Sequence, residues 1–292
     1  MSIGGAFEAF IDWLKNNFQP LFDAISVMIS STTGALEGAL LFLPDYVMVL
    51  LFAALAWWVA SRGVALFTLI GMGLLSQLEL SLFGTQVSVG MGYWTITMQT
   101  LALILTASLF SLLVGIPTGI WAAKNDTVDA IVRPVLDFMQ TMPSFVYLIP
   151  AVVLFGLGTV PGVIATFIFA TPPCVRLTNL GIRQVSEEAI EAARSFGSTQ
   201  TQLLFKVELP MALPTILAGI NQTVLLALSM VVVAALIGSD GLGQPVVEGL
   251  TQLQIGRGFE GGLGIVILAI FLDRITQAIG ERAGASEATQ AA

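Results

Sequence analysis

The sequence predicts an all-α polytopic membrane protein with about seven transmembrane helices, and three observations lead to this prediction. Of the 292 residues, 56% are hydrophobic and only 10% are charged, whereas soluble domains contain roughly 25% charged residues. The mean hydropathy is +0.90. Apolar runs such as residues 46–60 recur along most of the chain, and too few charged residues remain to cover them in water.

Candidate spans are windows of about 20 predominantly apolar residues bounded by charges, Gly or Pro. Seven windows fit, and the second is interrupted by Gln77 and Glu79. Pro143 and Pro150 interrupt the fourth window and Pro172-Pro173 the fifth, which predicts kinked or broken helices there. The windows are residues 44–60, 64–83, 93–123, 135–157, 160–178, 212–238 and 262–280.

Residues 1–35 are predicted to form an amphipathic segment on the outer membrane face. Apolar residues between Phe7 and Ile25 recur at spacings of three or four, with charged and amide residues between them. A short additional transmembrane helix is the alternative, although Asp12 and Asp23 would be costly in lipid. Residues 36–92 then hold the first two windows as accessory transmembrane helices.

The distribution of Lys and Arg predicts the orientation, because these residues accumulate on the cytoplasmic side. Seven spans with a cytoplasmic carboxyl terminus place nine of the eleven basic residues in or beside inner segments. Only Lys15 and Arg257 then lie outside. We therefore expect the amino terminus outside and residues 281–292 as a short cytoplasmic tail.

Several chemistries are excluded. The chain has one cysteine, Cys174, and no histidine, so it forms no internal disulfide, common zinc site or His-based acid–base catalyst. An ATP-binding Walker A loop requires Gly-Lys followed by Ser or Thr, whereas Lys15, Lys124 and Lys206 are followed by Asn, Asn and Val. The sequence thus predicts no catalytic residue, no metal site and no cofactor bound by this chain, which is not an enzyme.

Residues 179–211 form the one long cytoplasmic segment between predicted spans, and they contain residues that typically start and end helices. Ser186 is predicted to cap a helix that ends at a left-handed turn at Gly197. Ser198 is predicted to start a second helix that stops near Pro210. Because this second helix exposes apolar residues, including Leu203, the segment needs a partner.

The spacing within this segment carries a resemblance. Glu-Ala-Ala at 191–193 is followed by Gly197, Val207 and Leu209-Pro210 at intervals that resemble the EAA loop of binding-protein-dependent ABC importer permeases. In that family the loop forms a coupling helix seated in a groove of the ATPase. The resemblance therefore implies ATPase coupling by Glu191, Ala192, Ala193, Gly197, Leu209 and Pro210.

The similarity extends from about Met98 to Gly280. Residues 137–150, 154–162, 176–182, 221–223 and 273–277 resemble the permease of glycine betaine and proline betaine importers. This implies a five-helix permease core of the methionine-importer type over residues 93–280, with the coupling loop at 179–211.

The same resemblance implies the assembly and the function. Two copies of this permease as a homodimer, two copies of a separate ATPase that binds ATP and Mg, and an external substrate-binding protein are expected, with no nucleic acid. The complex is expected to carry a betaine, choline or a related methylated amine across the bacterial inner membrane.

Polar and aromatic residues inside the spans are candidates for the substrate pathway, because lipid penalises polar groups that face neither a cavity nor a helix. An interhelical hydrogen bond is an equally good account of any single one. Aromatic faces hold a quaternary ammonium by cation–π attraction of about 0.5–2 kcal/mol, which favours two aromatic residues of the fourth window. The candidates are Gln140, Thr141, Phe145, Tyr147 and Asn221.

Two other functions are weighed against this one. An ion-gradient-driven secondary transporter would also contain broken helices and buried polar groups, but the spans show no evident inverted repeat and no isolated buried carboxylate. A purely structural role as a membrane scaffold explains the helices but not the helix–turn–helix predicted at 186–210.

Gly115 and Gly119 are expected to serve helix contact rather than transport.

Overall fold

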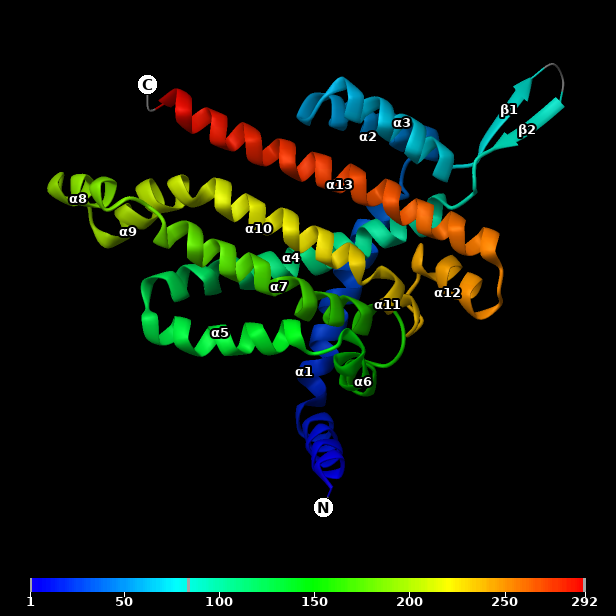
Figure 1. The fold of residues 1–292 in the computed structure, drawn as a ribbon. Helices are drawn as coiled ribbons and strands as arrows, with labels where there is room; N and C mark the ends of the chain where they lie inside the picture. Colours follow the sequence, from blue (N-terminus) through cyan, green and yellow to red (C-terminus); the bar gives the residue numbers. More distant parts are fainter. Residues whose placement is uncertain (1, 83–84, 291–292) are drawn as a thin grey trace.

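The computed structural model describes residues 2–82 and 85–290 as a bundle of long helices with one small hairpin (Figure 1). The first third contains α1 (Ile3–Leu40), α2 (Asp45–Val59), α3 (Arg62–Leu75), β1 (Leu78–Leu82) and β2 (Thr85–Val89). The remainder contains α4 (Trp94–Lys124), α5 (Asp126–Thr141), α6 (Ser144–Phe155), α7 (Thr159–Arg183), α8 (Glu187–Ser195), α9 (Gln200–Leu203), the π-helical turn η1 (Leu204–Glu208), α10 (Leu209–Ser229), α11 (Val231–Ala235), α12 (Gly243–Thr251) and α13 (Ile255–Gln290).

Among the described residues, four helical stretches are long and apolar enough to cross a membrane. They are α4, α7, the run from α9 through α11, and the part of α13 up to Arg282. Two further pairs qualify together but are bent, α1 with α2 by 96° and α5 with α6 by 97°. With α5 and α6 as one broken span, the region from α4 to α13 holds the five helices of the predicted core. The count of seven stays a prediction, since α3 has only 14 residues.

The predicted span at 64–83 was wrong. Helix α3 ends at Leu75, and an antiparallel hairpin follows in which Leu78 pairs with Val89 and Leu82 with Thr85. The sequence Leu-Glu-Leu-Ser-Leu of β1 alternates apolar and polar residues, which is the period of a strand and not of a helix. The predicted all-α fold class is therefore correct for the helix bundle, to which this hairpin is added.

The predicted span at 135–157 is broken at Pro143, as its proline suggested. Met142 has extended backbone angles (φ −72°, ψ 129°), because the ring of a following proline disfavours the helical region. The chain then restarts as α6 almost perpendicular to α5. Pro150 lies inside α6 and causes no such break, so only one of the two prolines divides the span.

The core lies where α4, α7, α10 and α13 run side by side (Figure 1). Glycines let α4 approach α7 closely: a Cβ added to Gly115 would lie 2.9 Å from Sγ of Cys174, and one added to Gly119 would lie 2.6 Å from Cβ of Thr178. Small residues at such contacts allow dispersion forces to act between helices in a membrane. The prediction that this glycine pair serves helix contact is confirmed.

Helix α1 crosses the bundle instead of running along it (Figure 1). Its backbone is kinked at Phe18 (φ −121°, ψ 18°), and the part before the kink exposes Phe7 and Trp13. The later part packs on the core, where the Thr33 hydroxyl donates to Oγ1 of Thr106 at 3.2 Å. The predicted domain boundary after residue 35 falls inside this helix.

Candidate functional site

Helices α8 and α9 project together from one end of the bundle (Figure 1). The turn between them places Gly197 at φ +79°, in the left-handed region. Its amide donates to the Arg194 carbonyl at 2.9 Å, and the Ser198 amide donates to the Ala193 carbonyl at 3.1 Å. No described atom lies within 4 Å of a Cβ built on Gly197, so the backbone and not the space requires glycine. The predicted left-handed turn is confirmed.

The two helix starts differ from the prediction in detail. Ser186 is the N-cap residue of α8, but its side chain makes no capping hydrogen bond within the described part of the chain. The second helix is capped by Thr199, so the predicted start at Ser198 was wrong. Oγ1 of Thr199 accepts the Gln202 amide at 3.3 Å, and Oε1 of Gln202 accepts the Thr199 amide at 2.9 Å. This Thr-x-x-Gln capping box is visible in the sequence and could have been found there.

The predicted helix stop at Pro210 was also wrong. The chain passes from α9 through η1 into α10, and Pro210 lies in the first turn of α10 beside Leu209. A proline inside a continuous helical run removes one backbone hydrogen bond, and here the π-helical turn η1 lies directly before it. The projecting segment is therefore continuous with a spanning helix.

The projecting segment presents an open surface. All nine residues of α8 are at least partly exposed, Glu191 and Ala192 among them. The Phe196 ring is 91% exposed and Phe205 is also largely exposed, although Leu203 is buried, contrary to the expectation for that residue. These open aromatic rings are available for contact with another molecule.

An ion pair between an exposed lysine and a buried carboxylate connects this segment to α4. Glu208, at the end of η1, is only 3% exposed and pairs with Lys124, the last residue of α4. Glu208 was not among the predicted site residues, because nothing in the local sequence pattern distinguishes it from the other carboxylates of the segment. The pair connects the projecting segment to a second spanning helix besides α10.

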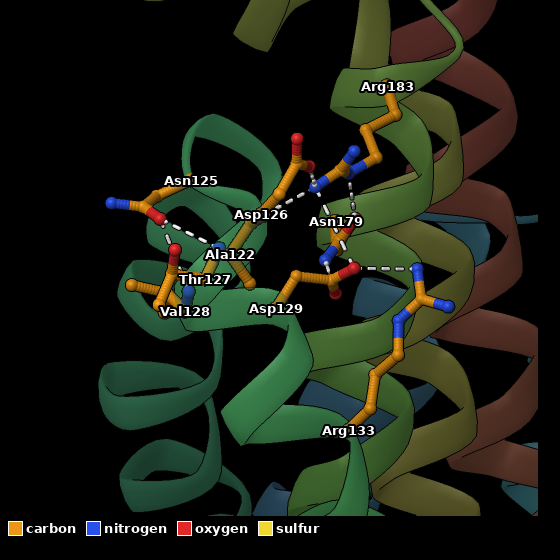
Figure 2. A network of polar contacts seen from close by, with 9 residues as sticks. All are labelled: Ala122, Asn125, Asp126, Thr127, Val128, Asp129, Arg133, Asn179 and Arg183. Carbon is orange, nitrogen blue, oxygen red and sulfur yellow. Dashed lines mark hydrogen bonds and ion pairs between the residues drawn. The ribbon is translucent and has the colours of Figure 1, made fainter.

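Next to this pair, a polar network joins α5 to α7 (Figure 2). Asn179 donates to Oδ1 of the buried Asp129 at 2.8 Å, and the Arg133 guanidinium lies 2.7 Å from the other oxygen of Asp129. Arg183 donates to Asn179 at 3.0 Å and to Asp126 at 2.7 Å. Because the buried polar groups of this network are paired, it holds the ends of α5 and α7 together.

The candidate pathway residues of α5 make contacts inside the chain. Oε1 of Gln140 accepts a hydrogen bond from Arg176 at 2.7 Å, and Arg176 also donates to Asp137 at 2.6 Å. The Thr141 hydroxyl donates to the Asp137 carbonyl of its own helix at 2.9 Å. Gln140 is therefore tied to a charged pair that sequence analysis did not single out.

The two aromatic candidates do not meet. Phe145 and Tyr147 are two residues apart on α6, and a helix directs such side chains to different sides. Phe145 is 55% exposed, whereas Tyr147 is 3% exposed and packs with Leu148, Ala165 and Met230. Within one chain, the structure does not bring them together as a cage for an ammonium group.

Asn221 joins α10 to α13. Its Nδ2 donates to Asp273 at 3.1 Å, its Oδ1 accepts from the Thr276 hydroxyl, and Gln277 donates to the same Asp273 at 2.6 Å. Two of the sequence segments that carried the family resemblance thus contact one another. This geometry favours the interhelical hydrogen bond over a pathway role for Asn221.

Residues 115–284 match the family described as the binding-protein-dependent transport system inner membrane component. The chain belongs to this family. The matched region includes the projecting segment α8–α9 and the network of Figure 2.

Two relatives show how far the similarity extends. The glycine betaine transport system permease protein OpuAB of Bacillus subtilis is 51% identical over 93% of this chain and 92% of its own length. The glycine betaine/proline betaine transport system permease protein ProW of Escherichia coli is 48% identical over 92% of this chain and 73% of its own length. The similarity is therefore not confined to the core and includes most of the first 90 residues.

A solved structure shows the same fold. The chain is similar to a chain of the inward-facing MetNI methionine ABC transporter with a TM-score of 0.59 and 20% identity, over 65% of this chain and 95% of the other. The covered share of this chain, 65%, is about the size of the predicted five-helix core at 93–280. The methionine-importer type of the core is thus confirmed at the level of the fold.

Proposed function

We propose that this chain is the permease subunit of an ATP-binding-cassette importer that carries a betaine or a related methylated amine across the bacterial inner membrane. The observation that carries the substrate class is the similarity to OpuAB and ProW over more than nine-tenths of the chain. Both relatives are named for betaines, which combine a methylated ammonium with a carboxylate. A choline-type solute shares the ammonium group alone.

In this proposal the projecting segment couples the chain to a separate ATPase, which binds ATP and Mg. Glu191, Ala192, Ala193 and Gly197 form the contact, and the exposure of α8 supports this assignment. Leu209 and Pro210 begin α10, so movement of α8 reaches one spanning helix directly and α4 through the Lys124 pair. Closure of the ATPases then switches the pathway between outward and inward access.

The assembly consists of two copies of this chain as a homodimer, two ATPases and an external substrate-binding protein. Lys124, Arg183 and Arg194 lie near the end that carries α8, which supports a cytoplasmic position for this end and for the tail at 281–292. Glu37 of α1 accepts from Gln99 near the opposite end of α4 at 3.0 Å. This contact supports an outer position for the amphipathic segment at 1–35, followed by accessory helices within 36–92.

Uptake by proteoliposomes tests the substrate class. Vesicles that contain this chain, its ATPase and its binding protein are expected to accumulate glycine betaine when ATP is supplied on the ATPase side. The measurement is the initial rate of radiolabelled solute uptake, with vesicles lacking the binding protein as the control. Import of amino acids without a methylated nitrogen, together with no import of betaines, choline or trimethylamine N-oxide, would contradict the assignment.

A further inference from the structure

Charged residues of both signs line a groove between α5 and α7. The groove has a volume of about 440 Å³, and its polar lining comes from one face of each helix. On α5, residues 129, 133 and 137 follow one another at intervals of four, and on α7 residues 176, 179 and 183 face them. The contributors are Asp129, Arg133, Asp137, Arg176, Asn179 and Arg183.

The polar contacts along the groove are buried at the helix ends and exposed farther along the helices. At the helix ends, Asp129 and Asn179 are buried and form the network that holds α5 to α7. Farther along the helices, Arg176 and Asp137 form an ion pair of 2.6 Å whose side chains are 42% and 66% exposed. The Asp129–Asn179 contact therefore joins α5 to α7 inside the chain. The Arg176–Asp137 pair, in contrast, is accessible from outside the chain.

The open pair lies well away from the ends of α5 and α7. Arg176 is seven residues before the end of α7, about 10 Å along the helix, and Asp137 is eleven residues after the start of α5, about 16 Å. Exposed charges at this depth are costly in hydrocarbon, and charged residues within spans face cavities or pathways. This cost favours a position facing the translocation pathway over one facing lipid.

We propose that Arg176 and Asp137 form a transient binding site for a zwitterionic solute in the inner half of the pathway. This inference rests on the proposed function. A betaine carries a carboxylate, which the planar guanidinium can bind through two parallel hydrogen bonds, and an ammonium, which the Asp137 carboxylate attracts. The solute replaces the internal ion pair with two ion pairs of its own.

This exchange explains how the site binds weakly enough to release its solute. Binding separates a pair that already satisfies both charges, so the gain over the empty state is small. Gln140 accepts from the same guanidinium at 2.7 Å and keeps the Arg176 side chain in place during the exchange. In this way Gln140, a sequence-predicted pathway residue, acts as a positioning residue for Arg176.

Cysteine accessibility tests the site in the assembled, reconstituted complex without nucleotide. In a Cys174→Ser background, Arg176→Cys and Asp137→Cys are expected to react with a small cationic thiosulfonate reagent at least tenfold faster than Val175→Cys, the buried neighbour. Protection by the solute is measured at Leu180→Cys, because this exposed residue lines the same groove and its replacement leaves Arg176 and Asp137 in place. Millimolar glycine betaine should slow its reaction. Equal rates at 175, 176 and 137 would show a pair sealed by lipid or by the second copy and would overturn the proposal, as would a rate at 180 that glycine betaine leaves unchanged.

Uptake by charge variants provides the second measurement. Arg176→Gln is expected to lower glycine betaine uptake at least tenfold, and Arg176→Lys should recover part of it, since the charge remains but the paired hydrogen bonds are lost. Wild-type uptake by Arg176→Gln would overturn this site while leaving the proposed function intact. Absence of uptake by the wild-type complex would refute the proposed function and this site with it.

Discussion

Gly197→Val is expected to leave the chain inserted in the membrane while reducing solute-stimulated ATP hydrolysis and uptake roughly tenfold or more. The turn holds this residue at φ +79°, and a left-handed conformation costs an ordinary residue about 1–2 kcal/mol, more when it is β-branched. The chain avoids that strain by changing the angle between α8 and α9, which displaces the surface that meets the ATPase. The measurement is uptake and ATPase activity in reconstituted complexes with equal permease content.

Gly197→Asn is the matched control, because asparagine tolerates the left-handed region and the site has open space around it. This variant should retain most of the wild-type activity. Glu191→Arg should also reduce both activities, through reversed charge on α8 and without backbone strain. Wild-type rates for Gly197→Val and Glu191→Arg would show that the segment is an ordinary connection.

Lys124→Met is expected to destabilise the permease by about 1–3 kcal/mol, because it leaves the buried carboxylate of Glu208 without its partner. The double variant Lys124→Met/Glu208→Met should recover most of the loss, since it also removes the buried carboxylate. The thermal unfolding midpoints of the purified complexes measure both effects.

Lys206→Met is the control for the loss of a positive charge. Lys206 lies in the same π-helical turn, is exposed and makes no ion pair with the described residues, so its replacement should leave the midpoint nearly unchanged. An unchanged midpoint for Lys124→Met would show that the pair contributes nothing. A double variant less stable than Lys124→Met would show that Glu208 is held by other contacts.

The long spans could be predicted because each is a long, mostly apolar run. The window 93–123 became α4 (Trp94–Lys124) almost without change. The window 160–178 was too short, since α7 continues to Arg183, and the break predicted at Pro172-Pro173 was wrong, since both prolines lie inside this one helix. Its last turns carry Arg176, Asn179 and Arg183, which resemble loop residues in the sequence but are paired with α5 in the fold.

The candidate site could be predicted only where local backbone conformation determines the structure. A glycine at the end of an amphipathic segment was sufficient to predict the turn at Gly197. The partner of Glu208 lies 84 residues away in the chain, and that of Arg176 lies 39 residues away. Such long-range pairs leave no periodic signal, which is why the Lys124–Glu208 and Asp137–Arg176 pairs were missed.

The most direct test of the central claim compares uptake by complexes that carry an active or a catalytically inactivated partner ATPase. In the proposed function, ATP is hydrolysed by that partner and not by this chain, so uptake depends on the partner. We predict that glycine betaine uptake stops when the ATPase is inactivated and continues when an uncoupler dissipates the ion gradient. Uptake that persists with the inactive ATPase and collapses with the uncoupler would contradict this account and identify an ion-driven secondary transporter.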